Sequence, residues 1–380
     1  ENVLKYIDFG SKYGFDGLLV EGWNTGWDEN WCCTGDGENF GFYHPHPEFN
    51  NKEIADYAKN KGIRLVGHHE TGTQINNYES QLDSAFSYCN RNGIRVVKTG
   101  YVNDGSQNIK RVTKDGTVYM EWHHGQYMVE HFRKVIETAA KYQVSLVPHE
   151  PIKDTGIRRT YPNILSREGA KGQEFNGFMS TKDNNKPNHT TILPFTRLLS
   201  SPMDYTPGIF NIKEYRYHSP DDRTINTNHH IPSTIAKELA LYVVIYAPVQ
   251  MAADLPENYT GHPAFQFILD VPTDWEQTIV LNGEIGQYIT TVRKDNHSDD
   301  WYLGSITNEN GRDLIINLSF LDPGIKYNAT IYKDPDDGGW KSNPEEVIID
   351  NIIIEKDSDY RLTLAPGGGQ AIRFSPFQPK

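Results

Sequence analysis

The chain has 380 residues, enough for about two domains and a large hydrophobic core. Its formal net charge of −13 argues against a nucleic-acid partner, because phosphates are bound by a surplus of Lys and Arg. No apolar run approaches the length of about 18 residues that a membrane-spanning helix requires. The 22 Tyr, 16 Phe and 7 Trp favour a carbohydrate ligand only weakly, since aromatic rings stack on sugars but also build cores.

Short apolar runs alternate with helical segments through the first 150 residues. The pattern predicts helices over 1–13, 51–61, 77–91 and 127–143, and apolar strands over 15–20, 63–67, 94–97 and 144–148. Such alternation is typical of a parallel sheet, in which active sites gather at the carboxyl ends of the strands. Each run here is followed directly by polar residues. The sequence therefore places one group of side chains around a common mouth: Glu21, Glu70, Lys98, His149 and Glu150.

Two long segments of the chain lack the strand–helix pattern. A long loop over 22–49 is rich in Trp, Gly and His, and long loops in compact domains are often functional. An Asp-Gly turn predicts a small hairpin around 113–118, and the chain is irregular from 150 to about 193. Helix and strand signals resume over 192–199, 231–246, 248–253 and 264–270.

From about residue 275, short alternating strands such as 288–292 and 301–306 are separated by Asn, Asp and Gly turns. This pattern predicts an antiparallel sandwich. We therefore expect two domains, 1–275 and 276–380. Because the first strand–helix repeat begins with its helix, we also expect the chain to be part of a longer protein.

Four acidic residues are candidates for chemistry at this mouth. Glycoside hydrolysis needs two carboxyl groups, one acting as an acid and one as a base or nucleophile. A single Glu is usually a solvated surface residue, but two His-Glu pairs at the strand ends of one sheet favour a functional role. Carboxylates that cluster suit Ca²⁺ better than zinc. The candidates are Glu70, Glu150, Glu168 and Glu174.

A transition-metal site is the alternative use of the polar residues. Adjacent histidines on a strand point to opposite faces, so His68 and His69 are not expected to chelate one ion together. Cys32 and Cys33 are adjacent, whereas zinc-binding pairs have intervening residues, and three cysteines do not make a disulfide framework. The remaining histidines of this alternative are His123, His124 and His149.

Several segments together resemble glycoside hydrolase family 97, and most closely its starch-utilising α-glucosidases. The resemblance covers essentially the whole chain, and the segments that carry it are 17–24, 68–71, 97–101, 149–150, 159–163, 189–197, 203–208 and 250–254.

The resemblance implies a particular domain plan. Members of the family have an N-terminal β-sandwich, a central (β/α)₈ TIM-type barrel and a C-terminal β domain. This chain resembles the barrel from its first helix onward, followed by the C-terminal antiparallel β-sandwich domain. The N-terminal sandwich and the first barrel strand are then missing from it.

The resemblance also implies roles for individual residues. Glu174 resembles the general acid, while Glu70 and Glu150 resemble the two bases that activate water. His68, Lys98, His149 and, with weaker support, Glu21 match residues that hold the sugar. The family binds Ca²⁺ in the active site, and its ligands map onto Glu150, Glu168 and Glu174, together with one Glu from the missing sandwich.

Gly100 separates two mechanisms. Retaining members of the family, which include α-galactosidases, carry an Asp nucleophile at the corresponding position, and glycine has no side chain that can attack. The implied function is therefore an inverting, calcium-dependent α-glucosidase that releases glucose from malto-oligosaccharides. The alternatives are an α-galactosidase or another α-glycosidase of the family, and a carbohydrate-binding protein without catalysis.

The expected partner is an oligosaccharide, with no nucleic acid and no membrane span. We expect a monomer or homodimer in the periplasm or outside a bacterial cell.

Overall fold

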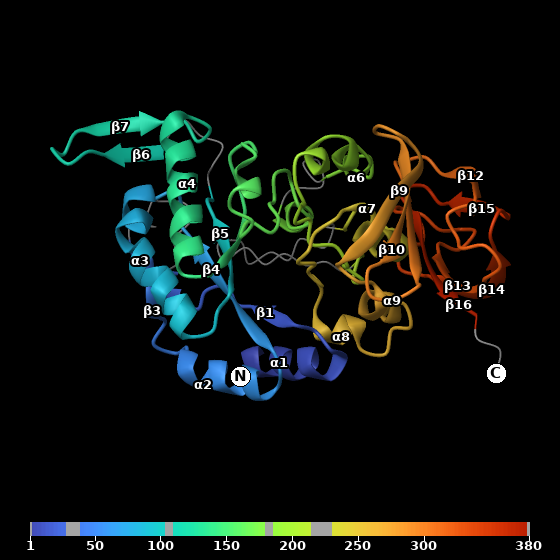
Figure 1. Ribbon diagram of the computed structural model, residues 1–380, viewed down its shortest axis with the longest axis horizontal. Helices are drawn as coiled ribbons and strands as arrows, with labels where there is room; N and C mark the ends of the chain where they lie inside the picture. The colour runs from blue at the N-terminus through green and yellow to red at the C-terminus, as the bar shows by residue number, and fades with distance from the viewer. Residues whose placement is uncertain (1, 28–38, 103–108, 179–184, 214–229, 378–380) are drawn as a thin grey trace. The chain divides into compact units, whose positions relative to one another are not determined.

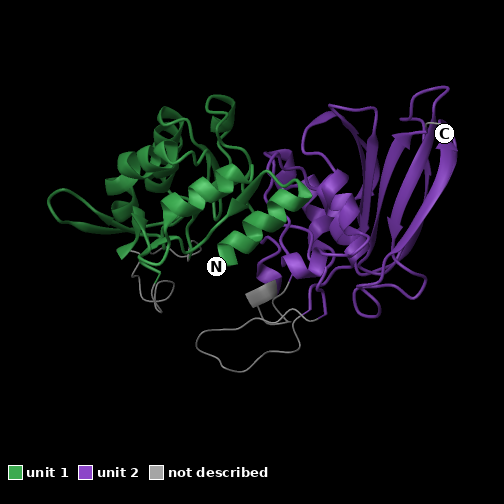
Figure 2. Ribbon diagram, turned by 90° about the horizontal axis from the view of Figure 1, so that it is seen from below, with its two compact units in different colours: residues 1–170 green, residues 171–380 purple. Residues whose placement is uncertain are grey.

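The structure is a computed structural model, which describes residues 2–27, 39–102, 109–178, 185–213 and 230–377. The chain divides into two compact units, residues 1–170 and 171–380, which Figure 2 shows in different colours. Cys32 and Cys33 lie outside the described residues. Among the helices that are described, none is both long and apolar enough to cross a membrane.

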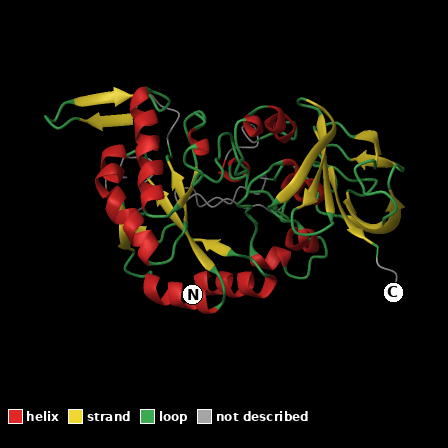
Figure 3. Cartoon of the chain, in the orientation of Figure 1, coloured by secondary structure: helices red, strands yellow, loops and turns green. Residues whose placement is uncertain are grey.

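The first unit is built on a four-stranded parallel sheet with the strand order β1-β4-β5-β8. Its strands are β1 (Gly17–Leu19), β4 (Arg64–Glu70), β5 (Val96–Gly100) and β8 (Ser145–Pro148). The helices of this unit are α1 (Asn2–Tyr13), α2 (Asn51–Asn60), α3 (Ile75–Arg91) and α4 (Gln126–Lys141), as Figures 1 and 3 show. A 3₁₀ helix, η2, covers Ile157–Arg159.

Helix α3 shows why these segments fold as they do. Its buried residues Tyr78, Leu82, Ala85 and Cys89 recur at helical spacing and form one apolar stripe. The stripe belongs to the same hydrophobic cluster as buried residues of β5 and β8, including Val97. The helix thus covers the sheet, and the predicted strand–helix alternation of this unit is confirmed.

Two antiparallel strand pairs branch from the first unit. The first is β2 (Asn24–Thr25) with β3 (Gly41–Pro45), on either side of the loop that follows β1. The second is β6 (Ile109–Val112) with β7 (Val118–Glu121), joined by the turn at Thr113–Thr117. The predicted hairpin is therefore present, with strands that lie outside the predicted turn segment.

The second unit carries a β-sandwich. Six antiparallel strands pair in the order β14-β13-β16-β11-β10-β9, and β12 pairs with β15 in a second sheet. Their bounds are β9 (Trp275–Glu284), β10 (Tyr288–Asp295), β11 (Trp301–Thr307), β12 (Arg312–Asn317), β13 (Lys326–Lys333), β14 (Ile348–Glu355), β15 (Asp359–Leu364) and β16 (Gly369–Pro376). Buried side chains of both sheets, such as Leu303 on β11 and Leu362 on β15, share one hydrophobic cluster. The predicted antiparallel sandwich is confirmed.

Helices and turns of the second unit precede the sandwich. They are α5 (Phe175–Phe178), α6 (His189–Ile192), η3 (Leu193–Phe195), η4 (Arg197–Leu199), α7 (Ile235–Val244), α8 (Pro256–Tyr259) and α9 (Phe265–Asp270). Helix α7 is buried along its whole length. It lies directly on the six-stranded sheet, because a Cβ on Gly304 of β11 would overlap the carbonyl oxygen of Ala240.

Two boundaries differ from the sequence prediction. Helix α7 begins only after Thr234, whose hydroxyl caps it by accepting from the Lys237 amide, and not at residue 231. Segment 248–253 has no regular element. The compact units divide between residues 170 and 171, while the domain boundary expected near residue 275 stays a prediction.

Candidate active site

The carboxyl ends of the parallel strands bring most of the predicted residues into one neighbourhood. His68 and Glu70 end β4, Lys98 lies on β5, and His149 and Glu150 follow β8 directly. In the sheet register His68 pairs with Lys98, and Glu70 pairs with Gly100. Glu21 and Glu168 complete the set in the first unit, whereas Glu174 belongs to the second unit.

Glu21, His68 and Lys98 form one polar cluster. Lys98 Nζ donates to Glu21 Oε1 at 3.2 Å, and His68 Nε2 lies 3.6 Å from the same oxygen. The Glu21 side chain is 53% exposed, and its interaction with His68, followed by that with Lys98, lowers its pKa to about 2. Burial lowers the pKa of His68 to about 4. At neutral pH the cluster therefore presents an ionised carboxylate and a neutral imidazole, which suit the hydroxyl groups of a sugar.

Glu70 is held by the backbone that follows its strand. Its Oε1 accepts hydrogen bonds from the amides of Gly72 at 2.7 Å and Val102 at 3.1 Å. The residue is 3% exposed. Burial, and then the negative charge of Glu150, raise its pKa to about 8. These two carboxyl groups are thus coupled, and positive charge nearby would favour ionisation of Glu70.

Glu150 lies in a strained backbone conformation, with φ of +42°. Its Oε2 accepts from the Tyr101 amide at 2.8 Å, and its carbonyl oxygen accepts from His123 Nε2 at 2.7 Å. A residue other than glycine keeps such a conformation only when its surroundings fix it, and strain of this kind is common at functional sites. The side chain and the backbone of Glu150 are therefore both held in place.

His149 and Glu168 form a buried pair. His149 Nδ1 and Glu168 Oε2 are 2.9 Å apart, and their side chains are 4% and 3% exposed. The backbone supports the pair, because the Glu168 amide donates to the Pro148 carbonyl at 3.0 Å. The hydrogen bond fixes the orientation of the His149 ring.

The donor chemistry of this region fits calcium. Glu150 and Glu168 bring carboxylate oxygens to the end of β8, and Glu174 follows about six residues later in the sequence. Hard carboxylate oxygens are the ligands that Ca²⁺ prefers. Glu168 is oriented by an imidazole, as carboxylate ligands commonly are.

His68 and His69 do not face a common metal site. His69 points away from His68, into the core, where its Nδ1 lies 3.0 Å from the Tyr78 hydroxyl. Burial lowers its pKa to about 3. The prediction that these neighbours face opposite sides of the strand is confirmed.

Three contributors to the site were not assigned by the sequence. His123 holds the Glu150 carbonyl, the Tyr101 amide holds its carboxylate, and Trp23 Nε1 donates to the His68 carbonyl at 2.8 Å. The position of His123 after the predicted hairpin was a weak signal of its place near the mouth. The other two contacts involve backbone atoms, which no residue pattern reveals.

Two family models match the chain. The model described as glycoside hydrolase 97 matches residues 1–170, and the model described as glycosyl-hydrolase 97 C-terminal, oligomerisation, matches residues 274–375. Together they account for most of the chain.

The chain is also similar to individual glycoside hydrolases. A retaining alpha-galactosidase from Bacteroides thetaiotaomicron is 29% identical over 374 residues, which are 97% of this chain and 49% of that protein. A solved family 97 enzyme from Pseudoalteromonas sp. strain K8 in complex with panose is 46% identical, with a TM-score of 0.91 over 99% of this chain and 56% of that one. The enzyme from the same source in complex with acarbose is 47% identical, with the same TM-score and coverage.

The chain spans about half the length of these relatives. The structural similarity confirms the predicted fold class, a TIM-type (β/α)₈ barrel followed by a C-terminal antiparallel β-sandwich. Four parallel strands of that barrel form the sheet of the first unit. On the two family models and this similarity, the chain belongs to glycoside hydrolase family 97.

Proposed function

We propose that this chain carries the catalytic machinery of an inverting, calcium-dependent α-glucosidase, which releases glucose from malto-oligosaccharides by direct attack of water. In this assignment Glu174 protonates the leaving oxygen, while Glu70 and Glu150 hold and activate the water. Glu21, His68, Lys98 and His149 hold the sugar.

One observation carries the proposal of inversion. A Cβ at Gly100 would overlap Glu70 Oε2, so the carboxyl group of Glu70 fills the space where a side chain from β5 would lie. A nucleophile at that position and Glu70 in its present place exclude each other. The geometry therefore favours a carboxyl group that acts on water rather than a side chain that attacks the anomeric carbon.

The chemistry then follows from the residues in place. The polar cluster of Glu21, His68 and Lys98 accepts and donates hydrogen bonds to sugar hydroxyls, which fixes the anomeric carbon relative to the acids. Water held by Glu70 and Glu150 loses a proton to the ionised member of this coupled pair as it attacks. Glu174 gives its proton to the glycosidic oxygen as the bond to the anomeric carbon breaks.

Calcium dependence has a physical reason in the pKa of Glu70. With a pKa of about 8, Glu70 keeps its proton at neutral pH when no cation is near. A calcium ion held by Glu150, Glu168 and Glu174 would supply positive charge that favours ionised carboxylates and orients the substrate. Glu70 would then be available as a base at neutral pH.

The preference for glucose rests on the relatives. The family 97 enzyme at 46–47% identity is described in complex with panose and with acarbose. Panose consists of glucose units, so this similarity favours an α-glucan substrate. The relative at 29% identity is named a retaining alpha-galactosidase, which keeps α-galactosidase activity as the second candidate.

Hydrolysis of nitrophenyl α-glucoside and nitrophenyl α-galactoside separates the two candidates. We expect kcat/KM to be higher for the glucoside, and preference for the galactoside would overturn the assignment. Glu174→Gln tests catalysis itself, because loss of the acid should lower kcat on maltose by about 10²- to 10⁴-fold while sparing binding. Unchanged turnover would remove Glu174 from the role of acid.

Assembly and location follow the same proposal. The description of the C-terminal family model includes oligomerisation, which supports a homodimer over a monomer. Malto-oligosaccharides derive from α-glucans that do not enter cells unaided, which favours a periplasmic or secreted enzyme.

A further inference from the structure

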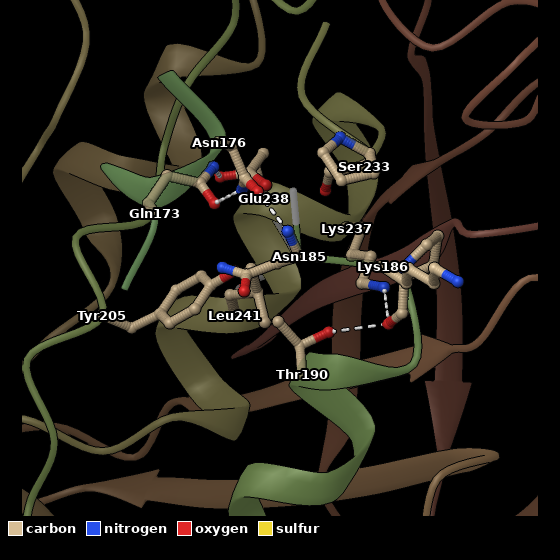
Figure 4. Close-up of a pocket in the computed structure, with 12 residues that line it drawn as sticks. Gln173, Asn176, Asn185, Lys186, Thr190, Tyr205, Ser233, Lys237, Glu238 and Leu241 are labelled. Carbon is tan, nitrogen blue, oxygen red and sulfur yellow. Dashed lines mark hydrogen bonds between the residues drawn. The ribbon is translucent and has the colours of Figure 1, made fainter. Parts of the chain in front are cut away.

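The residue before the proposed acid is buried in a polar pocket of the second unit. Gln173 is 4% exposed, and Glu238 on α7, which faces it, is 1% exposed. Both side chains line the pocket with Asn176 and Asn185 (Figure 4). Buried polar groups of this kind are costly unless paired, so their contacts specify one arrangement of the chain.

One oxygen of Glu238 gathers three donors. Glu238 Oε2 accepts from Gln173 Nε2 at 2.9 Å, from the Gly208 amide at 2.8 Å and from the Ile209 amide at 3.3 Å. The carboxyl group thus joins the segment that contains Gln173 to the segment around Gly208. Losing it would leave buried donors without an acceptor.

The backbone of Gln173 is fixed to the same segment. Its amide donates to the Tyr205 carbonyl at 2.9 Å, three residues before Gly208. Glu238 therefore holds the side chain of Gln173 directly, and it also holds the short segment to which the Gln173 backbone is bound.

A second set of contacts fixes the chain on both sides of Glu174. Gln173 Oε1 accepts from Asn176 Nδ2 at 3.1 Å, and Asn176 Oδ1 accepts from the Asn185 amide at 3.1 Å. Asn185 Nδ2 in turn donates to the Gly172 carbonyl at 3.0 Å. Residues on either side of Glu174 are thus tied to one network.

We propose that Gln173 and Glu238 are positioning residues that set the direction of the Glu174 carboxyl group. This inference rests on the proposed function, in which Glu174 is the acid. The step that depends on them is proton transfer from Glu174 to the glycosidic oxygen as the carbon–oxygen bond breaks. Water forms the new bond to the anomeric carbon and gives its proton to the base. Neither Gln173 nor Glu238 takes part in covalent chemistry.

Leaving-group dependence distinguishes this role from a general effect on folding. Fluoride leaves α-glucosyl fluoride with little help from an acid, whereas the glucose that leaves maltose needs a proton. We expect Gln173→Met to lower kcat on maltose about 10- to 100-fold, because general acids contribute 10²–10⁴-fold and misplacement loses part of it. On α-glucosyl fluoride kcat should change by less than about 3-fold, and so should KM for both substrates.

Gln370→Met is the matched control. Gln370 is a glutamine of the same unit, 1% exposed, whose Nε2 donates to the Tyr360 hydroxyl at 2.8 Å on β15. Its loss should lower the thermal midpoint in the same way but leave the ratio of the two rates unchanged. An equal loss on both substrates for Gln173→Met, or the same ratio change for Gln370→Met, would overturn the inference.

Two further variants complete the test. Glu238→Gln keeps the size of the side chain but weakens the acceptor, so the rate on maltose should again fall more than the rate on the fluoride. In a Glu174→Gln background, Gln173→Met should cost nothing more on maltose, because the two act on one proton transfer.

The outcomes separate the two proposals. If Glu174→Gln shows no leaving-group dependence, or the unmodified chain hydrolyses neither substrate, the proposed function fails. If Glu174→Gln shows that dependence and neither Gln173→Met nor Glu238→Gln does, only the positioning role fails.

Discussion

Gly100 and Glu70 are complementary residues on neighbouring strands, paired in the register of β4 and β5. The missing side chain of one leaves the space that the carboxyl group of the other fills. In the proposed assignment, the choice between inversion and retention depends on a single Cβ at residue 100. Glu150 is also fixed locally, because hydrogen bonds to its carbonyl and its carboxylate hold its strained backbone in place.

Gly100→Ala tests this complementarity. The new Cβ would displace Glu70 Oε2, and a shift of about 1 Å at a reacting group costs on the order of 100-fold in rate. We expect kcat on maltose to fall by about that factor, with a smaller change in KM. Gly10→Ala in α1 is the control, since its Cβ would meet only the flexible end of Ile63 and the side chain of Phe15. Unchanged kcat in Gly100→Ala would contradict the account of the Glu70 site.

The sequence identified the residues at the strand ends because polarity that follows an apolar run is a local pattern. It could not show that Glu70 fills the space over Gly100, since that depends on the register of two strands. Gln173 and Glu238 are 65 positions apart, and nothing near either residue marks their contact. Residue patterns and secondary-structure propensities do not reveal such long-range pairs.

Helices α3 and α4 are joined by a polar chain that reaches toward the site. Lys134 Nζ donates to Glu79 Oε2 at 2.6 Å, and His131 Nδ1 donates to Glu79 Oε1 at 2.9 Å. Burial lowers the pKa of His131, so its neutral ring accepts from the Tyr101 hydroxyl through Nε2 at 2.9 Å. The Tyr101 amide in turn holds Glu150. Packing of the two helices thus supports the strand end that carries the proposed base.

Glu79→Gln tests this link through stability. Burial opposes ionisation of Glu79, but hydrogen bonds from His131 and Lys134 outweigh it and lower the pKa from 4.5 to about 2. The ionised form therefore stabilises the fold above pH 4.5, and the contribution is lost as the pH falls through 2. We expect the variant to lose about 2 kcal/mol of unfolding free energy at pH 7.

The difference between wild type and Glu79→Gln should shrink as the pH falls from about 5 toward 2, measured by urea unfolding at each pH. Asp83→Asn is the control on the same helix, because the Asp83–Lys141 pair is exposed and such pairs contribute little. A difference that stays constant with pH would exclude ionised Glu79 as its source.

The existence of helices and strands was predicted better than the residues at which they begin and end. Helices α3 and α4 agree with the sequence because each shows an apolar stripe at helical spacing. Helix α7 is buried on all sides, so periodicity gave no clear start, and the cap at Thr234 decides it. The hairpin of β6 and β7 was recognised from its turn, but its strands extend beyond the predicted segment, since both carry mostly exposed side chains and no core-facing alternation.

At the scale of the whole molecule, the chain combines the carboxylates of the proposed active site with a net charge of −13. Burial, and then the negative charge of Glu150, raise the pKa of Glu70, since carboxyl groups that are close to one another are difficult to ionise together. A cation is the simplest means of relieving that repulsion, and the site offers the oxygen ligands that calcium prefers.

Removal of calcium should therefore change both rate and pH dependence. With a chelator, we expect kcat/KM on maltose to fall, and the acidic limb of its pH profile to move up toward pH 8 as Glu70 keeps its proton. Added Ca²⁺ should restore both, whereas Mg²⁺ should not, because its smaller octahedral shell suits carboxylate cages poorly. A profile that is the same with and without chelator would contradict calcium dependence.

Direct attack of water on the anomeric carbon determines which anomer is released first. Proton NMR of nitrophenyl α-glucoside hydrolysis, recorded within the first minutes before mutarotation, distinguishes the two outcomes, because all the glucose then comes from the cleaved bond. We expect β-glucose to appear first from the cleaved α-linkage. Initial release of α-glucose would show retention and contradict the assignment of Glu70 and Glu150 as bases.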